Sequence, residues 1–239
     1  MGTALFSITL KKESSAHMSM SFRGIKAVLF DLDGTLVDTM EAFHLMVNSL
    51  LRSFNKPERS FSENVKLVGK PSKTIVETIV RETGLDISVE EFSRIMFRKW
   101  VYTYMPKHGK LYPDSLKVLR ELKGRGYLLG VVSNTSREEL PHYLNSFEIG
   151  IFFNAAVSSG DVENPKPSPE PLLKAVKMLN VKPEEAVMIG DRPEDIQSGK
   201  SAGAYTIAVL RGVRPRAELE EAEPDFIVNE LSEILSILT

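Results

Sequence analysis

Cysteine is absent from this chain of 239 residues, which excludes disulfide bonds, thiolate nucleophiles and metal sites built on sulfur. No apolar run approaches the roughly 20 residues that a helix needs to cross a bilayer. The net charge is only −2, which gives no electrostatic basis for binding nucleic acid or an anionic membrane surface. We therefore expect neither a nucleic-acid partner nor a membrane partner.

The N-terminal residues lack the features of a targeting segment. Residues 1–23 contain no basic leader, no sustained apolar stretch and no small-residue cleavage site. We therefore expect no secretory signal and a cytoplasmic protein. We interpret residues 1–23 as an arm outside the folded core, either disordered or an effect of start-site choice, with Met18 and Met20 as alternative starts.

Histidine is scarce as well. His17, His44, His108 and His142 show no metal-ligand spacing, so we interpret all four as structural. Otherwise the composition is that of an ordinary globular protein, with 42% hydrophobic and 26% charged residues. This length and composition suffice for one large domain with a modest insertion.

Short apolar runs along the chain are typical of strands buried in a parallel sheet. Helical patterns lie between them, and strands that alternate with helices indicate a sheet covered on both faces. We therefore predict an α/β fold with a doubly wound, Rossmann-like parallel sheet. The predicted strands span 26–30, 127–132, 152–157, 185–189 and 204–209, with 226–228 as a strand at the edge.

The segment between the first two predicted strands has a different pattern. Apolar residues repeat at helical spacing around 43–54, 75–80 and 92–100. We predict two to four helices over residues 40–110, forming a small inserted domain. We interpret Trp100 as an anchor of its apolar core, with a substrate platform as the alternative. The α/β core is then made of residues 24–39 and 111–239.

Two helix starts in the predicted core are marked by capping residues. Asp114 is placed as the N-cap of a helix that begins at residue 115. Ser136 and Glu139 have the spacing of a capping box, but Pro141 would then lie inside the helix. A later helix start, at Pro141 itself, is the alternative.

Polar residues follow four of the predicted strands. Ligands bind beyond the carboxyl ends of the strands in a doubly wound sheet, so these residues are candidates for a site. Taken singly, they are equally typical of turns, helix caps or a surface lysine. They are Asp31 and Asp33 after the first strand, Ser133 and Asn134 after the second, Lys166 after the third, and Asp191 with Asp195 after the fourth.

Four segments together resemble the motifs of the haloacid dehalogenase superfamily, in the same order and at similar distances. They are FDLDGTLVDT, VVSNTS, the lysine of NPKPSPEP, and IGDRPEDI, and the resemblance covers about residues 25–212. The chain is most similar to the phosphoglycolate phosphatase and β-phosphoglucomutase group, whose helical cap is inserted after the first motif. The resemblance implies a phosphatase that acts on a small phosphorylated metabolite.

The resemblance implies a role for each motif residue, and elementary chemistry is compatible with it. Asp31 would be the nucleophile and form an aspartyl-phosphate, which splits hydrolysis into two displacements. Asp33 would protonate the leaving alcohol and then deprotonate the attacking water. Because the backbone bends after Asp31, the sequence leaves open whether these two carboxylates converge. Ser133, Asn134 and Lys166 would bind the phosphoryl group, and Ser133 and Lys166 would also be catalytic.

The resemblance also implies Mg²⁺, which prefers oxygen ligands and would offset the repulsion between an anionic nucleophile and an anionic phosphate. The implied ligands are the side chain of Asp31, the backbone carbonyl of Asp33 and the side chain of Asp191. Asp195 would lie beside the metal ligands and orient Lys166.

Three other functions compete with a phosphatase. A sugar phosphomutase would return the phosphoryl group to a bound sugar, and it differs mainly in cap closure and water exclusion. A non-catalytic binding protein is disfavoured because Asp31, Asp33, Lys166 and Asp191 are all present. A dehalogenase is disfavoured by Asp33, since a halide leaving group needs no proton. The physiological substrate and the oligomeric state stay open.

A loop in the predicted cap is the last candidate. Residues 68–72, VGKPS, precede a predicted helix and resemble the specificity loop of such caps. Gly69 permits close approach of the backbone, and Lys70 would meet a second anionic group on the substrate. A solvated surface lysine is an equally good explanation of Lys70.

Overall fold

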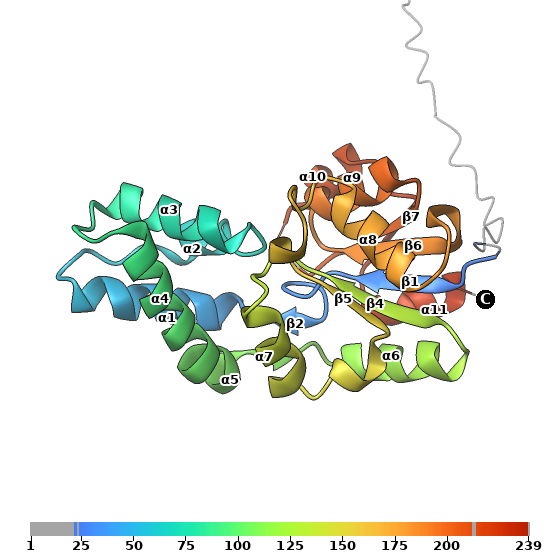
Figure 1. Cartoon of the computed structure of the whole chain (residues 1–239), viewed down its shortest axis with the longest axis horizontal. Helices are drawn as coiled ribbons and strands as arrows, with labels where there is room; N and C mark the ends of the chain where they lie inside the picture. The colour runs from blue at the N-terminus through green and yellow to red at the C-terminus, as the bar shows by residue number, and fades with distance from the viewer. Residues whose placement is uncertain (1–21, 23, 212–213, 239) are drawn as a thin grey trace, which may run out of the picture.

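The computed structural model describes residues 22, 24–211 and 214–238, and it has two lobes (Figure 1). The larger lobe contains a six-stranded sheet in the order β5-β4-β1-β6-β7-β8, and all neighbouring strands are parallel. This confirms the predicted α/β fold with a doubly wound parallel sheet. The strands are β1 (Ala27–Phe30), β4 (Leu128–Val132), β5 (Ala155–Val157), β6 (Ala186–Gly190), β7 (Tyr205–Val209) and β8 (Phe226–Val228).

Helices cover both faces of this sheet because successive strand residues point to opposite sides. Val28 and Phe30 of β1 join one apolar cluster, whereas Ala27 and Leu29 join another. In Figure 1, α6 and α11 lie on one side of the sheet and α8 and α9 on the other. The core helices are α6 (Ser115–Gly124), α7 (Glu139–Ser146), α8 (Glu170–Met178), α9 (Pro193–Ala202), α10 (Arg216–Glu221) and α11 (Ile234–Ile237).

The smaller lobe is helical and is inserted between two short strands that pair antiparallel, β2 (Val37–Asp38) and β3 (Lys110–Leu111). It has more helical segments than the two to four predicted. A π-helix between α4 and α5 was not predicted, and it carries Trp100. The segments are α1 (Met40–Ser53), α2 (Phe61–Val65), α3 (Ser72–Thr83), α4 (Val89–Lys99), the π-helix (Trp100–Tyr104) and α5 (Met105–His108).

Two further expectations concern the N-terminal arm and membrane-spanning helices. Of the predicted N-terminal arm only Phe22 is described, and the rest lies outside the described residues. Phe22 is buried and packs against Tyr205 and Phe226. Among the residues that the structure describes, none of the helices is long and apolar enough to cross a membrane.

One predicted strand in the core needs correction, and one predicted helix cap is confirmed in its position but not in its hydrogen bond. The predicted strand 152–157 is shorter, because residues up to Phe152 form a 3₁₀ turn and β5 begins at Ala155. Asp114 occupies the N-cap position of α6 but makes no side-chain capping bond. Its carboxylate instead accepts hydrogen bonds from Arg211 at 2.8 Å and from the backbone N–H of Ser232 at 3.1 Å.

The start of α7 settles the question raised by Pro141. The backbone N–H of Ser136 donates to Glu139 Oε2 at 3.0 Å, and that of Glu139 donates to Ser136 Oγ at 3.2 Å. The two reciprocal hydrogen bonds of the capping box are therefore present, although the N-cap position itself belongs to Glu138. The helix begins at Glu139, which places Pro141 in the first turn, where a missing N–H costs nothing. The alternative start at Pro141 is wrong.

Candidate active site

The candidate residues meet at the carboxyl edge of the sheet because they follow three adjacent strands, β4, β1 and β6. Asp31, Ser133 and Asp191 are all buried there. The sheet ladder continues past the strand ends, since the N–H of Asp31 donates to Ile189 O at 2.9 Å and that of Ser133 donates to Val157 O at 3.0 Å. The backbone that carries these side chains is therefore fixed by the sheet itself.

Lys166 reaches this edge from the loop after β5 and is almost completely buried. Its Nζ donates to Asp31 Oδ1 at 2.7 Å, to Asp195 Oδ1 at 2.6 Å and to Val132 O at 2.8 Å. Burial alone would lower the pKa of Lys166, but the charges of Asp195 and Asp31 outweigh it and raise the pKa above its ordinary value. Lys166 is thus held as a cation, and all three of its donors are directed.

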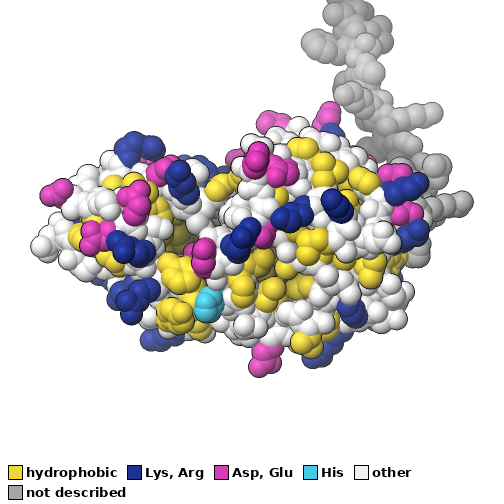
Figure 2. Space-filling view, viewed as in Figure 1, with side chains coloured by type: hydrophobic (Ala, Val, Ile, Leu, Met, Phe, Trp, Pro, Cys, Tyr) yellow, Lys and Arg dark blue, Asp and Glu magenta, His cyan; other side chains and the backbone are white. Residues whose placement is uncertain are grey.

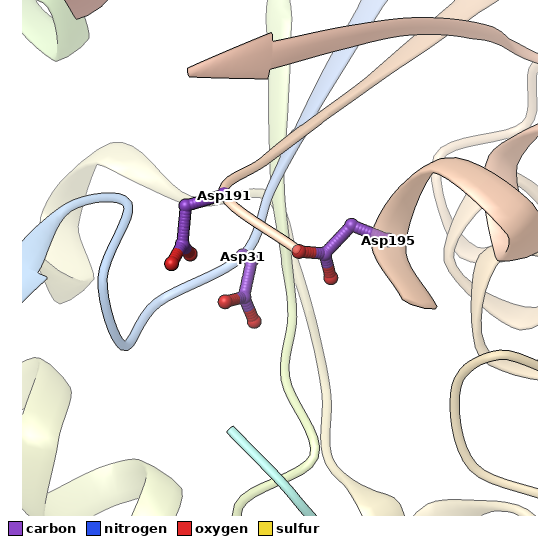
Figure 3. A group of neighbouring side chains, drawn as sticks. All are labelled: Asp31, Asp191 and Asp195. Carbon is purple, nitrogen blue, oxygen red and sulfur yellow. The ribbon is translucent and has the colours of Figure 1, made fainter. Parts of the chain in front are cut away.

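Three carboxylates form a group that suits a divalent cation. One oxygen from each of Asp31, Asp191 and Asp195 lies within 4.8 Å of the others, and Figure 3 shows the three side chains gathered between β1 and the start of α9. Asp31 Oδ2 and Asp191 Oδ2 are buried and have no hydrogen-bond partner among the described residues. Thr35 Oγ1 donates to the other oxygen of Asp191 at 2.9 Å. Two unpartnered carboxylate oxygens at one place fit a hard cation that takes oxygen ligands.

The raised pKa of Asp191 also favours a bound cation at this place. Burial is the largest cause that raises its pKa well above the ordinary value, and repulsion from Asp31 and Asp195 adds to it. Charged carboxylates so close together in a dry site are costly, and a bound cation relieves that cost. The residues present therefore fit a metal, held by the side chains of Asp31 and Asp191.

Asp195 is already occupied by protein contacts. Its Oδ1 accepts from Lys166 Nζ, and its Oδ2 accepts from the backbone N–H of Arg192 at 3.1 Å. Burial raises the pKa of Asp195 to about 7, while the charge of Lys166 opposes the rise. Both oxygens are thus engaged in holding Lys166 and the start of α9.

Asp33 lies apart from this carboxylate group and has its own partners. Its Oδ1 accepts from Thr39 Oγ1 at 2.7 Å and from Tyr143 OH at 2.9 Å. Tyr143 OH in turn accepts from Trp100 Nε1 at 3.1 Å. Burial raises the pKa of Asp33 to about 7, repulsion from Asp31 adds to the rise, and the two hydrogen bonds oppose it. Asp33 can therefore both give and take a proton near neutral pH.

The bend after Asp31 depends on Gly34. Its φ is +90°, a conformation that side chains other than glycine rarely adopt. A Cβ at this position would also come within 2.4 Å of the Asp191 carboxylate. Gly34 thus allows the chain to bend after Asp33 while Asp191 packs directly against the loop.

Ser133 and Asn134 follow β4 at the same edge. Ser133 Oγ accepts from the backbone N–H of Thr135 at 3.1 Å, which leaves its hydroxyl hydrogen available to a ligand. Asn134 is tied to the loop of Lys166, since its Oδ1 accepts from the Lys166 N–H at 3.0 Å and its Nδ2 donates to Lys166 O at 3.1 Å. The Asn134 amide therefore fixes the backbone of the lysine.

The predicted specificity loop of the small lobe contacts the core. Asn134 Nδ2 donates to Gly69 O at 3.3 Å, and Arg192 Nη1 donates to Val68 O. Gly69 has a φ of +80°, and a Cβ there would come within 2.7 Å of the Arg192 side chain. The absence of a side chain at Gly69 thus permits the close approach.

A second contact between the lobes involves Glu139. Its Oε2 accepts from Ser72 Oγ of the small lobe at 2.8 Å and from Thr135 Oγ1 of the core at 3.0 Å. Next to it, a cavity of about 680 Å³ lies between the lobes, and hydrophobic side chains are visible in the recess in Figure 2. Asp33 and Lys70 both line this cavity.

Several residues of the site were not singled out from the sequence. Thr35 and Thr39 lie inside the FDLDGTLVDT segment, so the motif itself was a signal for them. Arg192 likewise lies inside IGDRPEDI, although its contact with Val68 arises only when distant segments pack together. Tyr143 had no such signal, because it reaches Asp33 only in the folded chain. Trp100 is buried as predicted, but it also lines the cavity and bonds to Tyr143.

Known proteins resemble this chain in sequence and in overall structure. The family model of the haloacid dehalogenase-like hydrolases matches residues 28–209. The curated pyrophosphatase PpaX of Bacillus cereus (strain B4264) is 36% identical over 217 residues, which cover 90% of this chain and 97% of the relative. A predicted phosphoglycolate phosphatase from Haemophilus somnus 129PT has a similar structure, with a TM-score of 0.79, 25% identity, and coverage of 90% of this chain and 98% of that chain.

A proposed β-phosphoglucomutase from Thermotoga maritima is also similar in structure, with a TM-score of 0.75 and 25% identity over 89% of this chain and 98% of that chain. The family match spans more than half of the chain, and the curated relative is matched along nearly its whole length. The motifs, the sheet and these relatives together show that the chain belongs to the haloacid dehalogenase-like hydrolases.

Proposed function

We propose that this protein is a magnesium-dependent phosphatase that hydrolyses a small-molecule phosphomonoester through an aspartyl-phosphate at Asp31. One observation carries the proposal. A buried acid with a pKa of about 7, Asp33, lies two residues from a carboxylate, Asp31, that is held by a buried lysine. A nucleophile and a proton donor that titrates near neutral pH are the two groups that this hydrolysis needs.

In the first displacement, a carboxylate oxygen of Asp31 bonds to phosphorus while the bond from phosphorus to the leaving oxygen breaks. Asp33 gives its proton to that oxygen, so an alcohol departs instead of an alkoxide. Lys166 offsets the negative charge on Asp31 and on the phosphoryl group. Ser133 donates its hydroxyl hydrogen to a phosphoryl oxygen.

In the second displacement, Asp33 acts as a base and takes a proton from water. The water oxygen bonds to phosphorus, and the bond between phosphorus and Asp31 breaks. Inorganic phosphate leaves, and Asp31 and Asp33 return to their starting states. Asn134 and Asp195 support both displacements by holding Lys166 in place.

Mg²⁺ would be held by the side chains of Asp31 and Asp191 and by the backbone carbonyl of Asp33. When bound, it supplies positive charge that neutralises the phosphoryl oxygens and the carboxylates around them. Thr35 helps to set this site, because it fixes one oxygen of Asp191 and leaves the other free.

We further propose that residues 40–110 act as a cap over a core made of residues 24–39 and 111–239. The loop 68–72 would then read the part of the substrate beyond the phosphate. Lys70 lines the cavity, and we propose that it contacts a second anionic group where a substrate carries one.

The experiment that tests the function is an acid quench of the enzyme during turnover of p-nitrophenyl phosphate with Mg²⁺. We expect a phosphoryl group on the peptide that contains Asp31, detected by mass spectrometry, together with steady release of phosphate. Asp31→Asn is the matched control and should show neither. Phosphorylation of another residue would contradict the proposal, and isomerisation of a sugar phosphate without phosphate release would favour a phosphomutase.

A further inference from the structure

The cavity between the lobes lies on the leaving-group side of the proposed reaction. Of the four motif residues Asp31, Asp33, Lys166 and Asp191, only Asp33 lines it. Asp33 is the residue that would protonate the leaving oxygen. The group attached to that oxygen therefore extends from Asp33 into this cavity.

The wall that the small lobe contributes is mostly apolar. Its residues come from α1, α3, α4 and the π-helix, so the cavity reaches into the small lobe itself. Most of these side chains are buried, and they offer a leaving group apolar contact and no hydrogen bonds. They are Phe43, Met46, Ile75, Val76, Ile95 and Met96.

The polar side chains on the core side of the cavity are already paired with one another. Thr39 and Tyr143 both donate to Asp33. Thr135 and Ser136 both bond to Glu139, which also accepts from the small lobe. A leaving group rich in hydroxyl or phosphoryl oxygens would therefore find few free partners here, and burying such oxygens unpaired is costly.

The cavity is lined by exposed charges of both signs, and also by the partly buried Lys70 and Glu139 besides Asp33. Arg94 and Arg98 of α4 are exposed, and so are Glu91 and Glu138. Exposed charges of mixed sign give no strong field inside the cavity, so among the residues that line it Lys70 is the cation placed to meet a second anionic group. The exposed arginines and glutamates suit the rim of a binding site whose interior is mostly apolar.

The size of the cavity points to a large leaving group. A volume of about 680 Å³ falls within the range of sites that bury a drug-sized molecule. The two-carbon alcohol of phosphoglycolate, or the second phosphate of pyrophosphate, would leave most of this space unfilled.

We propose that the substrate is a phosphomonoester whose leaving alcohol carries an extended apolar body, alkyl or aryl, and that this body occupies the cavity. The proposal rests on the proposed function and names its substrate class. When the leaving oxygen meets Asp33 from the cavity side, the apolar body is buried against the small lobe. Each added methylene that enters the cavity therefore strengthens binding.

A series of n-alkyl phosphates from ethyl to octyl, assayed with Mg²⁺ below their micelle concentrations, tests this directly. All members release a primary alcohol of nearly the same acidity, so differences in kcat/KM report on the cavity and not on the chemistry. We expect kcat/KM to rise by up to about fourfold for each methylene. A flat or falling series, or a higher kcat/KM for pyrophosphate or phosphoglycolate than for octyl phosphate, would overturn the inference and leave the phosphatase standing. Absence of phosphate release from every member and from p-nitrophenyl phosphate would refute the proposed function itself.

Two matched variants in the small lobe test whether the apolar wall of the cavity causes the rise of kcat/KM with chain length. Ile95 lines the cavity, whereas Val80 is a half-buried residue of the same lobe that does not. Ile95→Gln should lower kcat/KM for octyl phosphate by at least about tenfold and flatten the series, because a polar group then stands in the apolar wall. Val80→Gln should keep the wild-type slope. Equal slopes in both variants would overturn the placement of the apolar body.

Wild-type protein offers a binding readout that needs no variant. Trp100 is the only tryptophan of the chain, and it lines the cavity. Octylphosphonate, which cannot be hydrolysed, should change its fluorescence and bind at least tenfold more tightly than ethylphosphonate. Equal affinities of the two phosphonates would overturn the inference.

Discussion

The protonation of Asp33 sets how fast an unactivated alcohol can leave. With the ordinary pKa of 3.8, Asp33 would be protonated at pH 7 in roughly one molecule in 1,600, because 7 − 3.8 = 3.2 and 10 to the power 3.2 is about 1,600. With the raised pKa of about 7, roughly one molecule in two carries the proton. The environment of Asp33 therefore increases the population of the proton donor by about 800-fold, and burial is the largest cause.

This environment predicts the pH dependence of the enzyme. For an alkyl phosphate, kcat/KM should fall as the pH rises through about 7, since deprotonated Asp33 cannot protonate the leaving oxygen. Bound Mg²⁺ beside Asp31 offsets part of the repulsion, which places the fall at pH 7 or slightly below. Tyr143→Phe removes a hydrogen bond that lowers the pKa of Asp33, so the fall should move to higher pH. Tyr127→Phe, in the core but away from Asp33, is the control and should leave the profile unchanged.

Asp33→Asn should remove the alkaline fall for an alkyl phosphate and reduce kcat/KM by roughly a hundredfold to ten-thousandfold. With p-nitrophenyl phosphate the first displacement should suffer much less, because its leaving group needs no proton. Values of kcat/KM for both substrates across neutral pH check this, because kcat/KM reports on the first displacement and not on the second. An alkaline fall that persists in Asp33→Asn, or equal losses on both substrates, would refute the role of Asp33 as the acid.

Three further substitutions test the remaining parts of the site. Asp31→Asn should lower phosphate release by several orders of magnitude with the fold intact by circular dichroism, and a tenth of wild-type activity, once deamidation is excluded, would contradict covalent catalysis. Asp191→Ala should weaken Mg²⁺ binding in calorimetric titration far more than it lowers the Tm, and full wild-type activity in excess chelator would refute the metal requirement. Lys70→Ala should raise KM by about tenfold or more for phosphoesters with a second anionic group and hardly affect alkyl phosphates, and equal effects on both would remove Lys70 from the site.

The sheet could be predicted from the sequence because a strand buried on both faces is a continuous apolar run that stops at a polar residue. The prediction of 26–30 agrees with β1, Ala27–Phe30, to within one residue. Local patterns failed where apolar residues serve a turn, as Phe152 does before β5. They placed Asp114 correctly at the N-cap of α6 but gave no sign that its carboxylate bonds to the distant Arg211.

The polar residues of the motifs could likewise be predicted, because strand order brings the carboxyl ends of β4, β1 and β6 together. Thr35 and Thr39 lie in the first motif, and each bonds to a motif acid: Thr39 to the nearby Asp33, and Thr35 to Asp191 at the end of a neighbouring strand. The motif therefore encodes more of the site than the acids alone.

The tertiary structure alone decided what surrounds those acids. Tyr143 reaches Asp33 across 110 positions of sequence, and Ser72 reaches Glu139 across 67. The cavity exists only where α1, α3, α4 and the start of α7 face one another. The sequence determined which groups react, because short-range geometry places them at the strand ends. The packing of the two lobes determined the pKa of Asp33 and the space beyond it, because burial and cavity shape depend on segments that meet only in the folded chain.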